Sequence, residues 1–344
     1  MSLIYPSMNK TLKVAEDRAY DDSNTVLPVE IARGTYIEHP PSAQALKLLH
    51  LMIARAAGAM AEDRHHELRA SDFRAIKGMR KHDKASLMPL FTQLRAATFH
   101  YDDVEAKELH IGGFLDHAKI DYRFEDDTGE ITVRWWFGGL FKKLAADSNH
   151  WAIIDRQTVF NLRSKYSILL FQHISSLVNL DHKVSQIFTI KELRGMLGVP
   201  EGKLVRWTHL SRDALKPAVS EVNQLARFTV KATPIKDGRH VDAVRISWEV
   251  KPDIKPVKAE LDRPKTGRKA RREGSVEIPA NPFPDTGGIR YSQPWGETAK
   301  QHGNGKDINL IANDFRKWCK SKGIPLDGAQ IAKQFESFCK RAKI

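Results

Sequence analysis

The most constraining feature of the sequence is the order of elements that its apolar pattern predicts between residues 151 and 250. Apolar residues recur at helical spacing over 164–178, which indicates one amphipathic helix. Thr189 and Glu192 then have the spacing of a capping box, which predicts the start of a second helix. Gly198 is typical of a helix end, so this second helix is only about two turns long.

A longer helix and a hairpin complete the pattern. Apolar residues at helical spacing predict a helix over about 208–225, and Pro217 is expected to kink it. Alternating apolar residues flank an Asp-Gly turn over 228–250, which predicts a β-hairpin. Helix, short helix, longer helix and hairpin is the order of a winged helix, with a helix-turn-helix followed by a wing.

Residues 42–150 repeat this order more loosely. Helices are predicted over 42–57 and 84–97, with a short helix capped by Ser71 between them. Strands are predicted after the third helix, over 98–101, 107–111, 120–124 and 131–137. The sequence therefore predicts an α+β fold with two tandem winged-helix domains.

Three further regions differ in composition from these two domains. Residues 1–41 are polar and predict an irregular N-terminal arm. Residues 251–296 are rich in Pro, Gly and charge, which predicts a flexible, disordered basic linker, and 297–344 carry two apolar stripes that predict a small helical hairpin. Within the expected pair of domains, 42–150 is assigned to dimerisation and backbone contacts and 151–250 to sequence reading.

The charge of the chain favours a polyanionic partner. Lys and Arg total 55 against 42 Asp and Glu, a formal net charge of +13. An excess of this size attracts nucleic acid in most cases and an anionic membrane in fewer. Residues 251–344 hold 20 basic and 11 acidic side chains, so most of the excess lies outside the two predicted winged helices.

Signatures of other protein classes are missing from the sequence. It has no P-loop motif, no paired metal-binding histidines and only two cysteines, so we expect no catalytic residue, metal or cofactor, and no enzyme activity. No apolar run is long enough to span a membrane, and the first residues do not have the pattern of a signal peptide. We therefore expect a cytoplasmic protein without a membrane partner.

The candidate DNA-binding residues of the second domain lie where a recognition helix begins. They are Lys203, Arg206, His209, Arg212 and Lys216. Arg212 has the geometry to bind a guanine edge with two hydrogen bonds, whereas lysines more often contact phosphates. At the wing tip, Lys236 and Arg239 are expected to reach phosphates, together with His240. The alternative for both groups is an exposed helix face or turn whose charges are only solvated.

Two more basic groups are candidates for phosphate contact. Arg80, Lys81 and Lys84 precede the third helix of the first domain, in the place that corresponds to the cluster above. This domain alternatively uses that face against a partner subunit. The second group belongs to the basic run 263–272 and consists of Arg268, Lys269, Arg271 and Arg272. Its alternative is a solvated linker that self-repulsion keeps extended.

The second domain resembles the iteron-plasmid replication initiators, which are tandem winged-helix Rep proteins. Leu162–Tyr166 with Leu169–Phe171 looks like the entry helix of that family. The segment Leu215-Lys-Pro-Ala-Val-Ser-Glu-Val-Asn223 is similar to its "L-x-P-A-x-x-E-[IV]-N" signature, and Gly238–Val241 matches its wing turn. Over residues 42–155 the resemblance rests on the order of elements.

The resemblance implies a plasmid replication initiator. Such proteins bind directly repeated origin sites as monomers, and as dimers joined through the first winged helix they repress their own gene. They help to open the origin and recruit the host initiator, helicase and primase, and they are neither nucleases nor ATPases. Sequence reading carries over to the helix that begins near Thr208, hence to Arg206, His209 and Arg212. Two alternatives remain open: a tandem winged-helix transcriptional regulator without a replication role, and an adaptor that uses winged helices for protein contacts.

Overall fold

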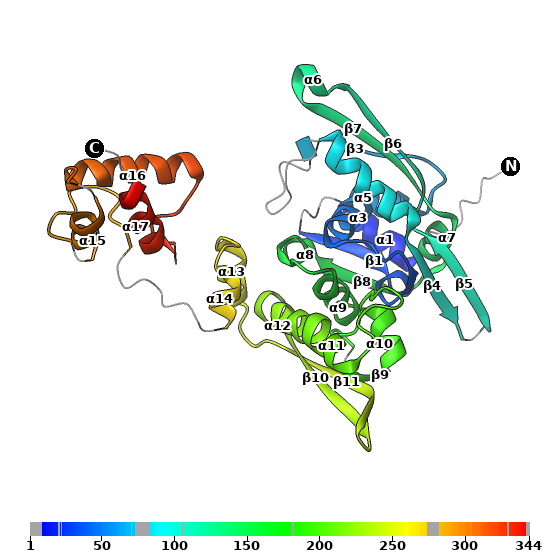
Figure 1. Cartoon of the computed structure of the whole chain (residues 1–344). Coiled ribbons are helices and arrows are strands. Elements are labelled where there is room, and N and C mark those ends of the chain that lie inside the picture. The colour runs from blue at the N-terminus through cyan, green and yellow to red at the C-terminus, as the bar shows by residue number, and fades with distance from the viewer. Residues whose placement is uncertain are drawn as a thin grey trace. The chain divides into compact units, whose positions relative to one another are not determined.

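The computed structural model resolves two compact units, Met1–Arg263 and Pro264–Ile344, which are described separately (Figure 1). The described residues are 9–19, 21, 23–69, 71–72, 83–104, 106–180, 182–273, 282–292, 294–303, 305–328 and 330–341. Two winged helices lie in the first unit, as the sequence predicts. None of the described helices is both long and apolar enough to cross a bilayer.

The first winged helix combines helices with two three-stranded sheets, ordered β2-β4-β5 and β3-β7-β6. Its elements after the N-terminal segment are α3 (Ala43–Ala56), η1 (Ala57–Ala61), β3 (His66–Arg69), α5 (Lys84–Ala96), β4 (Thr98–Asp103), β5 (Glu108–Gly113), β6 (Leu115–Phe124), α6 (Glu125–Thr128), β7 (Glu130–Phe137) and α7 (Gly139–Asp147). The helices predicted over 42–57 and 84–97 are confirmed, and side chains alternate between buried and half-buried along β7. The short helix predicted after Ser71 falls mostly on 73–82, outside the described residues.

The N-terminal segment is part of this fold. It forms α1 (Lys10–Asp17), β1 (Asn24–Pro28), α2 (Val29–Ala32) and β2 (Thr35–Glu38). Strand β1 pairs antiparallel with β8 (Trp151–Asp155), and Val26 and Leu27 are buried. The prediction of an irregular arm over 1–41 is therefore wrong for the described residues. The partner strand lies more than 120 residues away in sequence, so no local pattern could reveal this pairing.

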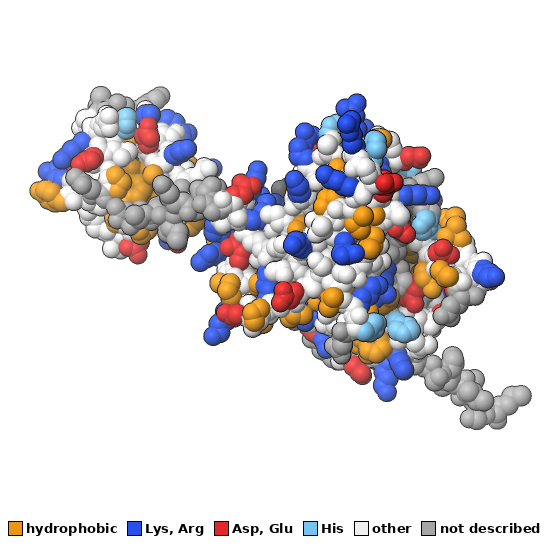
Figure 2. All heavy atoms as spheres, turned by 90° about the horizontal axis from the view of Figure 1, so that it is seen from below, with side chains coloured by type: hydrophobic (Ala, Val, Ile, Leu, Met, Phe, Trp, Pro, Cys, Tyr) orange, Lys and Arg blue, Asp and Glu red, His pale blue; other side chains and the backbone are white. Residues whose placement is uncertain are grey.

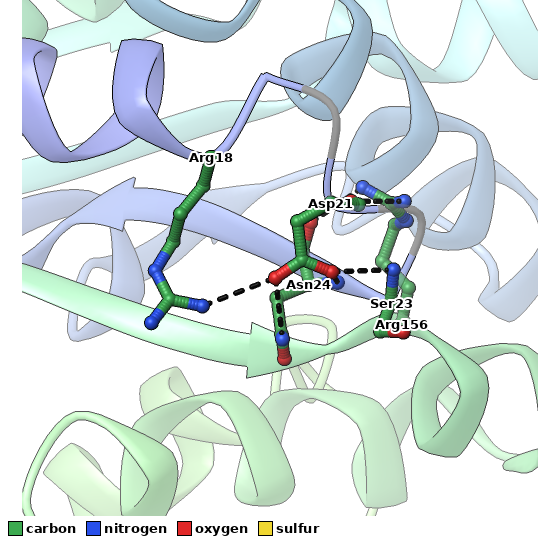
Figure 3. Close-up of polar contacts among 5 residues, drawn as sticks. All are labelled: Arg18, Asp21, Ser23, Asn24 and Arg156. Carbon is green, nitrogen blue, oxygen red and sulfur yellow. Dashed lines mark hydrogen bonds and ion pairs between the residues drawn. The ribbon is translucent and has the colours of Figure 1, made fainter.

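A polar clamp fixes the start of β1 (Figure 3). The Asp21 carboxylate accepts hydrogen bonds from the backbone N–H of Ser23 at 2.7 Å and from the Asn24 side chain at 2.9 Å, and it pairs with Arg18 at 3.0 Å. Arg156, which begins the helix after β8, donates to the carbonyls of Asp21 and Asn24. Hydrogen bonding to Asn24 is the main reason why the pKa of Asp21 lies below its usual value. The clamp therefore ties the N-terminal segment to the beginning of the second winged helix.

The second winged helix follows the predicted order. Its elements after β8 are α8 (Arg156–Asn161), α9 (Lys165–Ser175), β9 (Ser185–Thr189), α10 (Ile190–Met196), α11 (Trp207–Leu210), the π-helical turn η2 (Ser211–Leu215), α12 (Lys216–Leu225), β10 (Phe228–Asp237) and β11 (His240–Val250). The sheet has the order β10-β11-β9, and the β10–β11 hairpin is the wing. Pro217 lies in the first turn of α12, directly after η2. A wider turn at that point accommodates a proline ring, which explains where the expected irregularity falls.

The two winged helices share one apolar core, which contains buried residues from both. Polar contacts also cross the junction: the Lys47 ammonium donates to the Phe160 carbonyl at 3.0 Å, and the Gln172 amide donates to the carbonyls of Ile31 and Ala32. The junction is thus packed and hydrogen-bonded, which favours a fixed arrangement of the two domains.

The region after the wing contains more structure than its composition predicts. Helix α13 (Lys255–Asp262) packs on α12 and α8, and α14 (Arg268–Arg272) forms one further turn. The prediction of a disordered linker over 251–296 is therefore wrong for these residues. Val257 and Leu261, one helical turn apart, are both buried, so a short apolar stripe anchors α13 to the first unit.

The C-terminal unit is a three-helix body and not the predicted hairpin over 297–344. Its helices are α15 (Trp295–His302), α16 (Ile308–Lys322) and α17 (Ile331–Arg341). Phe283, Trp295, Phe315 and Phe335 meet in its core at ring separations of 4.7–5.7 Å. Arg316 extends the core contacts, because its guanidinium donates to the carbonyls of Pro284 and Gly287 at 2.8 and 2.6 Å. Residues from the predicted linker thus belong to this unit.

Candidate nucleic-acid interface

The turn of the helix-turn-helix is held by one arginine. Thr189 and Glu192 make the predicted reciprocal capping box at the start of α10. From the same helix, Arg194 donates to the carbonyls of Leu204 and Lys203 at 2.7 and 2.5 Å. These bonds hold the segment between α10 and α11, which includes the unusual positive φ of 49° at Leu204. The sequence analysis missed this role, because only the fold brings the Arg194 side chain to those carbonyls.

The predicted recognition residues share an exposed face. His209, Arg212 and Lys216 are exposed and follow one another at intervals of three and four residues along α11, η2 and α12. Lys203 and Arg206 are also exposed and lie immediately before α11. Residues three and four apart lie on one side of a helix, so the structure brings three cations to one face and places two more at its beginning. This is the part of a helix-turn-helix that enters a major groove.

Arg212 is engaged with its neighbour on this face. Its guanidinium makes two hydrogen bonds to the Asp213 carboxylate, at 2.7 and 2.8 Å. The pair raises the pKa of Arg212 and lowers the pKa of Asp213. Both side chains are exposed, and exposed ion pairs add little stability. The pair can therefore open at little cost, and Asp213 is an acidic group on the recognition face that the sequence analysis did not single out.

The most specific sequence signature holds the fold and does not lie on the exposed face. Glu221 is buried, and its carboxylate accepts hydrogen bonds from the backbone N–H groups of Arg163 and Ser164 at the start of α9. Asn223 bonds both the N–H and the carbonyl of Val230 in β10, at 2.6 and 2.9 Å. The signature thus joins α12 to the entry helix and to the wing, and it positions the recognition face without belonging to it.

The wing tip presents the predicted cations to solvent. Lys236, Arg239 and His240 are all exposed, and Gly238 takes the positive φ of 57° that the turn requires. Figure 2 views the molecule from below, where the wing points, and shows that Lys and Arg side chains alternate with acidic and neutral ones on the larger unit. The basic charge of this unit is therefore local and does not form one continuous patch.

In the first winged helix, one of the three predicted phosphate contacts is described. Lys84 is exposed at the start of α5, while Arg80 and Lys81 lie outside the described residues. The Lys84 ammonium lies 3.6 Å from the centroid of the Tyr122 ring, and its backbone N–H donates to the Glu125 carboxylate at 3.0 Å. The head of α5 and the tip of the β6–β7 wing therefore meet.

Aromatic side chains at that tip were missed by the sequence analysis. Tyr122 and Phe124 are 49% and 57% exposed, and Arg123 lies between them in sequence with its guanidinium paired to Asp121 at 2.7 Å. The alternation of β6 signalled a strand but not its end in solvent. The first wing therefore presents aromatic and basic side chains together, unlike the purely polar tip of the second wing.

The predicted phosphate contacts of the basic run are mostly engaged within the protein. Arg268 is only 1% exposed. Arg271 donates to the carbonyls of Thr266 and Pro264, and Lys269 pairs with Glu273. Arg272 is half-buried. The expectation of an open basic linker is wrong here, because the run folds as α14 and uses its donors locally.

No metal site accompanies this interface in the described part of the chain, where no group of three or more His, Cys, Asp or Glu side chains is placed to hold an ion. Cys319 and Cys339 are buried in the C-terminal unit, and burial raises the pKa of both thiols, that of Cys339 to about 11. Neither is therefore a reactive thiolate near neutral pH.

Two family descriptions match the sequence, one over each winged helix. The family described as "Initiator Replication protein, WH1" matches residues 34–175, and "Initiator Rep protein, WH2" matches 189–248. No curated protein matches the sequence.

Two solved structures resemble parts of the fold. The Pi initiator protein in complex with iteron DNA is 17% identical, with a TM-score of 0.47 over 67% of this chain and 98% of that one. Domains 2 and 3 of RctB are 12% identical, with a TM-score of 0.36 over 61% of this chain and 83% of that one. At these values the likenesses carry no argument about residues.

Proposed function

Since the chain belongs to the Rep initiator family, through matches to both of its winged helices, we propose that it is a plasmid replication initiator that binds directly repeated double-stranded DNA at its origin. The observation that carries this proposal is the exposed face of His209, Arg212 and Lys216, at the head of a helix-turn-helix inside the matched WH2 region. The family matches favour this function over a transcriptional regulator without a replication role and over an adaptor.

The proposed contacts divide between the two domains. Arg212 and His209 read base edges in the major groove, while Lys203, Arg206 and Lys216 contact the adjacent phosphates. Lys236 and Arg239 of the second wing and Lys84 of the first domain contact the backbone on either side, with Arg80 and Lys81 as further candidates. Opening of the Arg212–Asp213 pair frees the guanidinium for a guanine and leaves Asp213 beside it as an acceptor for a cytosine amino group.

Gel-shift experiments with the DNA that flanks the gene test this function. We expect the protein to prefer a duplex that carries direct repeats over a scrambled duplex of the same composition by at least a thousandfold. Binding to a lone palindrome without repeats would favour the regulator instead. No binding to any duplex at low salt would exclude both and leave the adaptor.

We propose that dimers form through strand β5 of the first winged helix and repress the chain's own gene. Strand β5 is the outer strand of the described β2-β4-β5 sheet. Leu109 and Ile111, on one side of this strand, are 58% and 61% exposed, and Val104 in the preceding turn is 76% exposed. Exposed apolar side chains on an unpaired edge favour the addition of a second strand, and a second copy of the chain supplies an identical one.

Charge substitutions at this edge test the dimer. Leu109→Lys with Ile111→Lys places like charges opposite each other, and we expect the dimer fraction in sedimentation equilibrium to fall by at least tenfold. Val184→Lys, at another exposed valine, is the matched control and should leave the dimer unchanged. An unchanged dimer in the double variant would exclude β5 as the interface.

The remaining roles follow from the family. We propose that the bound initiator recruits the host initiator and the replicative helicase in the cytoplasm, and that DNA opening uses these partners and no catalytic residue or cofactor of this chain. Co-sedimentation of purified helicase with the protein on origin DNA, compared with scrambled DNA, checks the recruitment step.

A further inference from the structure

The C-terminal unit lies outside both family matches, which end at residue 248. It has its own core of aromatic and aliphatic side chains. Residues 264–344 hold 16 Lys and Arg against 8 Asp and Glu, a net +8, whereas residues 1–263 hold 39 against 34, a net +5. This unit thus carries most of the net charge of the chain in less than a quarter of its length.

Most of the basic side chains of its described part are not used to hold the unit together. Arg290, Lys306 and Lys340 make salt bridges to acidic side chains, and Arg316 binds carbonyl groups. The other six are exposed and make no salt bridge among the described residues; they are Lys300, Lys317, Lys320, Lys322, Lys333 and Arg341. They come from all three helices, so the surplus charge surrounds the unit and does not sit at the head of one recognition helix.

Aromatic rings accompany these charges at the surface. Trp318 and Phe338 are half-buried, and their ring centroids are 5.7 Å apart across α16 and α17. Lys322 follows Trp318 by four residues and Arg341 follows Phe338 by three, so each ring has a cation on the next turn of its helix. Tyr291 is 95% exposed. Figure 2 shows apolar side chains at the surface of this unit with Lys and Arg side chains nearby.

We propose that the C-terminal unit binds single-stranded DNA. A single strand offers phosphates to the exposed cations and unpaired base faces to the aromatic rings, and this combination is the one that single-strand-binding surfaces use. A duplex keeps its base faces stacked, so Tyr291 and the Trp318–Phe338 pair have nothing to stack on there. The unit contains no described strand and therefore no wing, so duplex reading of the kind proposed for residues 189–248 is not expected of it.

This second site extends the proposed initiator function, because a duplex-reading domain and a strand-holding unit on one chain suit an origin that is being opened. The two can be tested separately. The strand-binding site depends on α16 and Tyr291, while the proposed duplex site depends on α11 to α12.

The first experiment measures binding of the full-length chain to a fluorescent 20-nucleotide oligo-dT over a range of salt concentrations. The variant Lys317→Gln/Lys320→Gln/Lys322→Gln removes three exposed charges from α16. We expect its affinity at 100 mM salt to fall at least tenfold, and the slope of log K against log salt to decrease by about 2, since each phosphate contact to a single strand contributes about 0.7. The control Lys13→Gln/Lys143→Gln/Lys258→Gln removes three exposed charges from the first unit and should leave affinity and slope unchanged.

A second variant tests the aromatic contribution. Tyr291 is exposed, so Tyr291→Ser should fold normally, and we expect it to weaken oligo-dT binding about fivefold or more without changing the salt slope. If the lysine triple and Tyr291→Ser both bind oligo-dT as the wild type does, the proposal is overturned. If oligo-dT binding follows these predictions but no repeat-bearing duplex is preferred, the strand-binding site stands and the proposed initiator function fails.

Discussion

The two winged helices have the same order of elements but expose different side chains. The second presents cations along one face of its recognition helix and at a polar wing tip. The first presents Leu109 and Ile111 on an edge strand and aromatic rings at its wing, with Lys84 beside them. The difference teaches that the fold alone does not assign a role to either domain; the exposed residues favour base reading by the second and association by the first.

The largest expected effect concerns how the two domains are joined. His50 of the first and His173 of the second are both buried, and burial lowers the pKa of His50 to about 4 and of His173 to about 3, with Arg156 and Arg33 adding to the effect. In the unfolded chain both take up a proton near pH 6.5. Their contribution to stability is therefore fully present above pH 6.5 and is lost as the pH falls toward 4. Between pH 6.5 and 5 we expect a loss of about 2 kcal/mol for each histidine.

Urea denaturation at pH 7.5, 6.0 and 5.0 measures this loss. His50→Gln and His173→Gln should each flatten the pH dependence, whereas substitution of the exposed His182 should not. If the wild type and the double variant lose stability in parallel between pH 6.5 and 5, the acid sensitivity does not come from the domain junction.

The next effect separates fold from DNA reading within the second domain. Asn223→Ala removes two hydrogen bonds to Val230 and should lower the free energy of unfolding by about 2 kcal/mol. Asn223→Asp keeps an acceptor for the Val230 N–H and should lose less. Below its melting temperature, Asn223→Ala should prefer the same DNA bases as the wild type in competition experiments. A changed base preference would place the signature in the interface itself.

Substitution of Arg212 tests base reading. If its guanidinium contacts a base, Arg212→Ala should weaken specific binding by about 1–3 kcal/mol and relax the preference at one position of the site. Asp213→Asn, which breaks the same intramolecular pair, is the control that distinguishes loss of the arginine from loss of the pair. Unchanged affinity and preference in Arg212→Ala would remove this residue from the interface.

The smallest effect is expected in the first domain. Lys84→Ala should weaken binding to all duplexes equally, by less than about 1 kcal/mol, and should reduce the salt slope by about 0.9. Lys107→Ala, at an exposed lysine in the β4–β5 turn, should leave the slope unchanged. A sequence-dependent loss in Lys84→Ala would give the first domain a share in base reading and would weaken the contrast between the domains.

The sequence predicted those parts that depend on local pattern. The helical spacing of α9, the capping box at Thr189 and the alternation of the wing are local signals, and each element was found where it was expected. The pairing of β1 with β8 and the attachment of residues 283–287 to Arg316 depend on contacts far apart in sequence. Such contacts override composition, which is why the arm and the linker were predicted wrongly.

The candidate site shows the same division. Exposure of the basic residues at the head of α11 followed from helical periodicity, which also buried Leu210 and Ala214 on the opposite side. The Arg194 contacts to the turn and the meeting of Lys84 with Tyr122 could not be predicted, because they join side chains to groups that only the folded chain brings together. Arg268 was predicted as a phosphate contact from charge alone, and burial contradicts it.

The most direct test of the central claim is the ratio of affinities for repeat-bearing and scrambled duplex, measured for the wild type and for His209→Ala/Arg212→Ala/Lys216→Ala. These side chains are exposed, so the triple variant should melt as the wild type does. We predict that it loses nearly all preference for the repeats while it keeps weak, salt-dependent binding to both duplexes. A triple variant that still prefers the repeats as strongly as the wild type would contradict the assignment of sequence reading to this face.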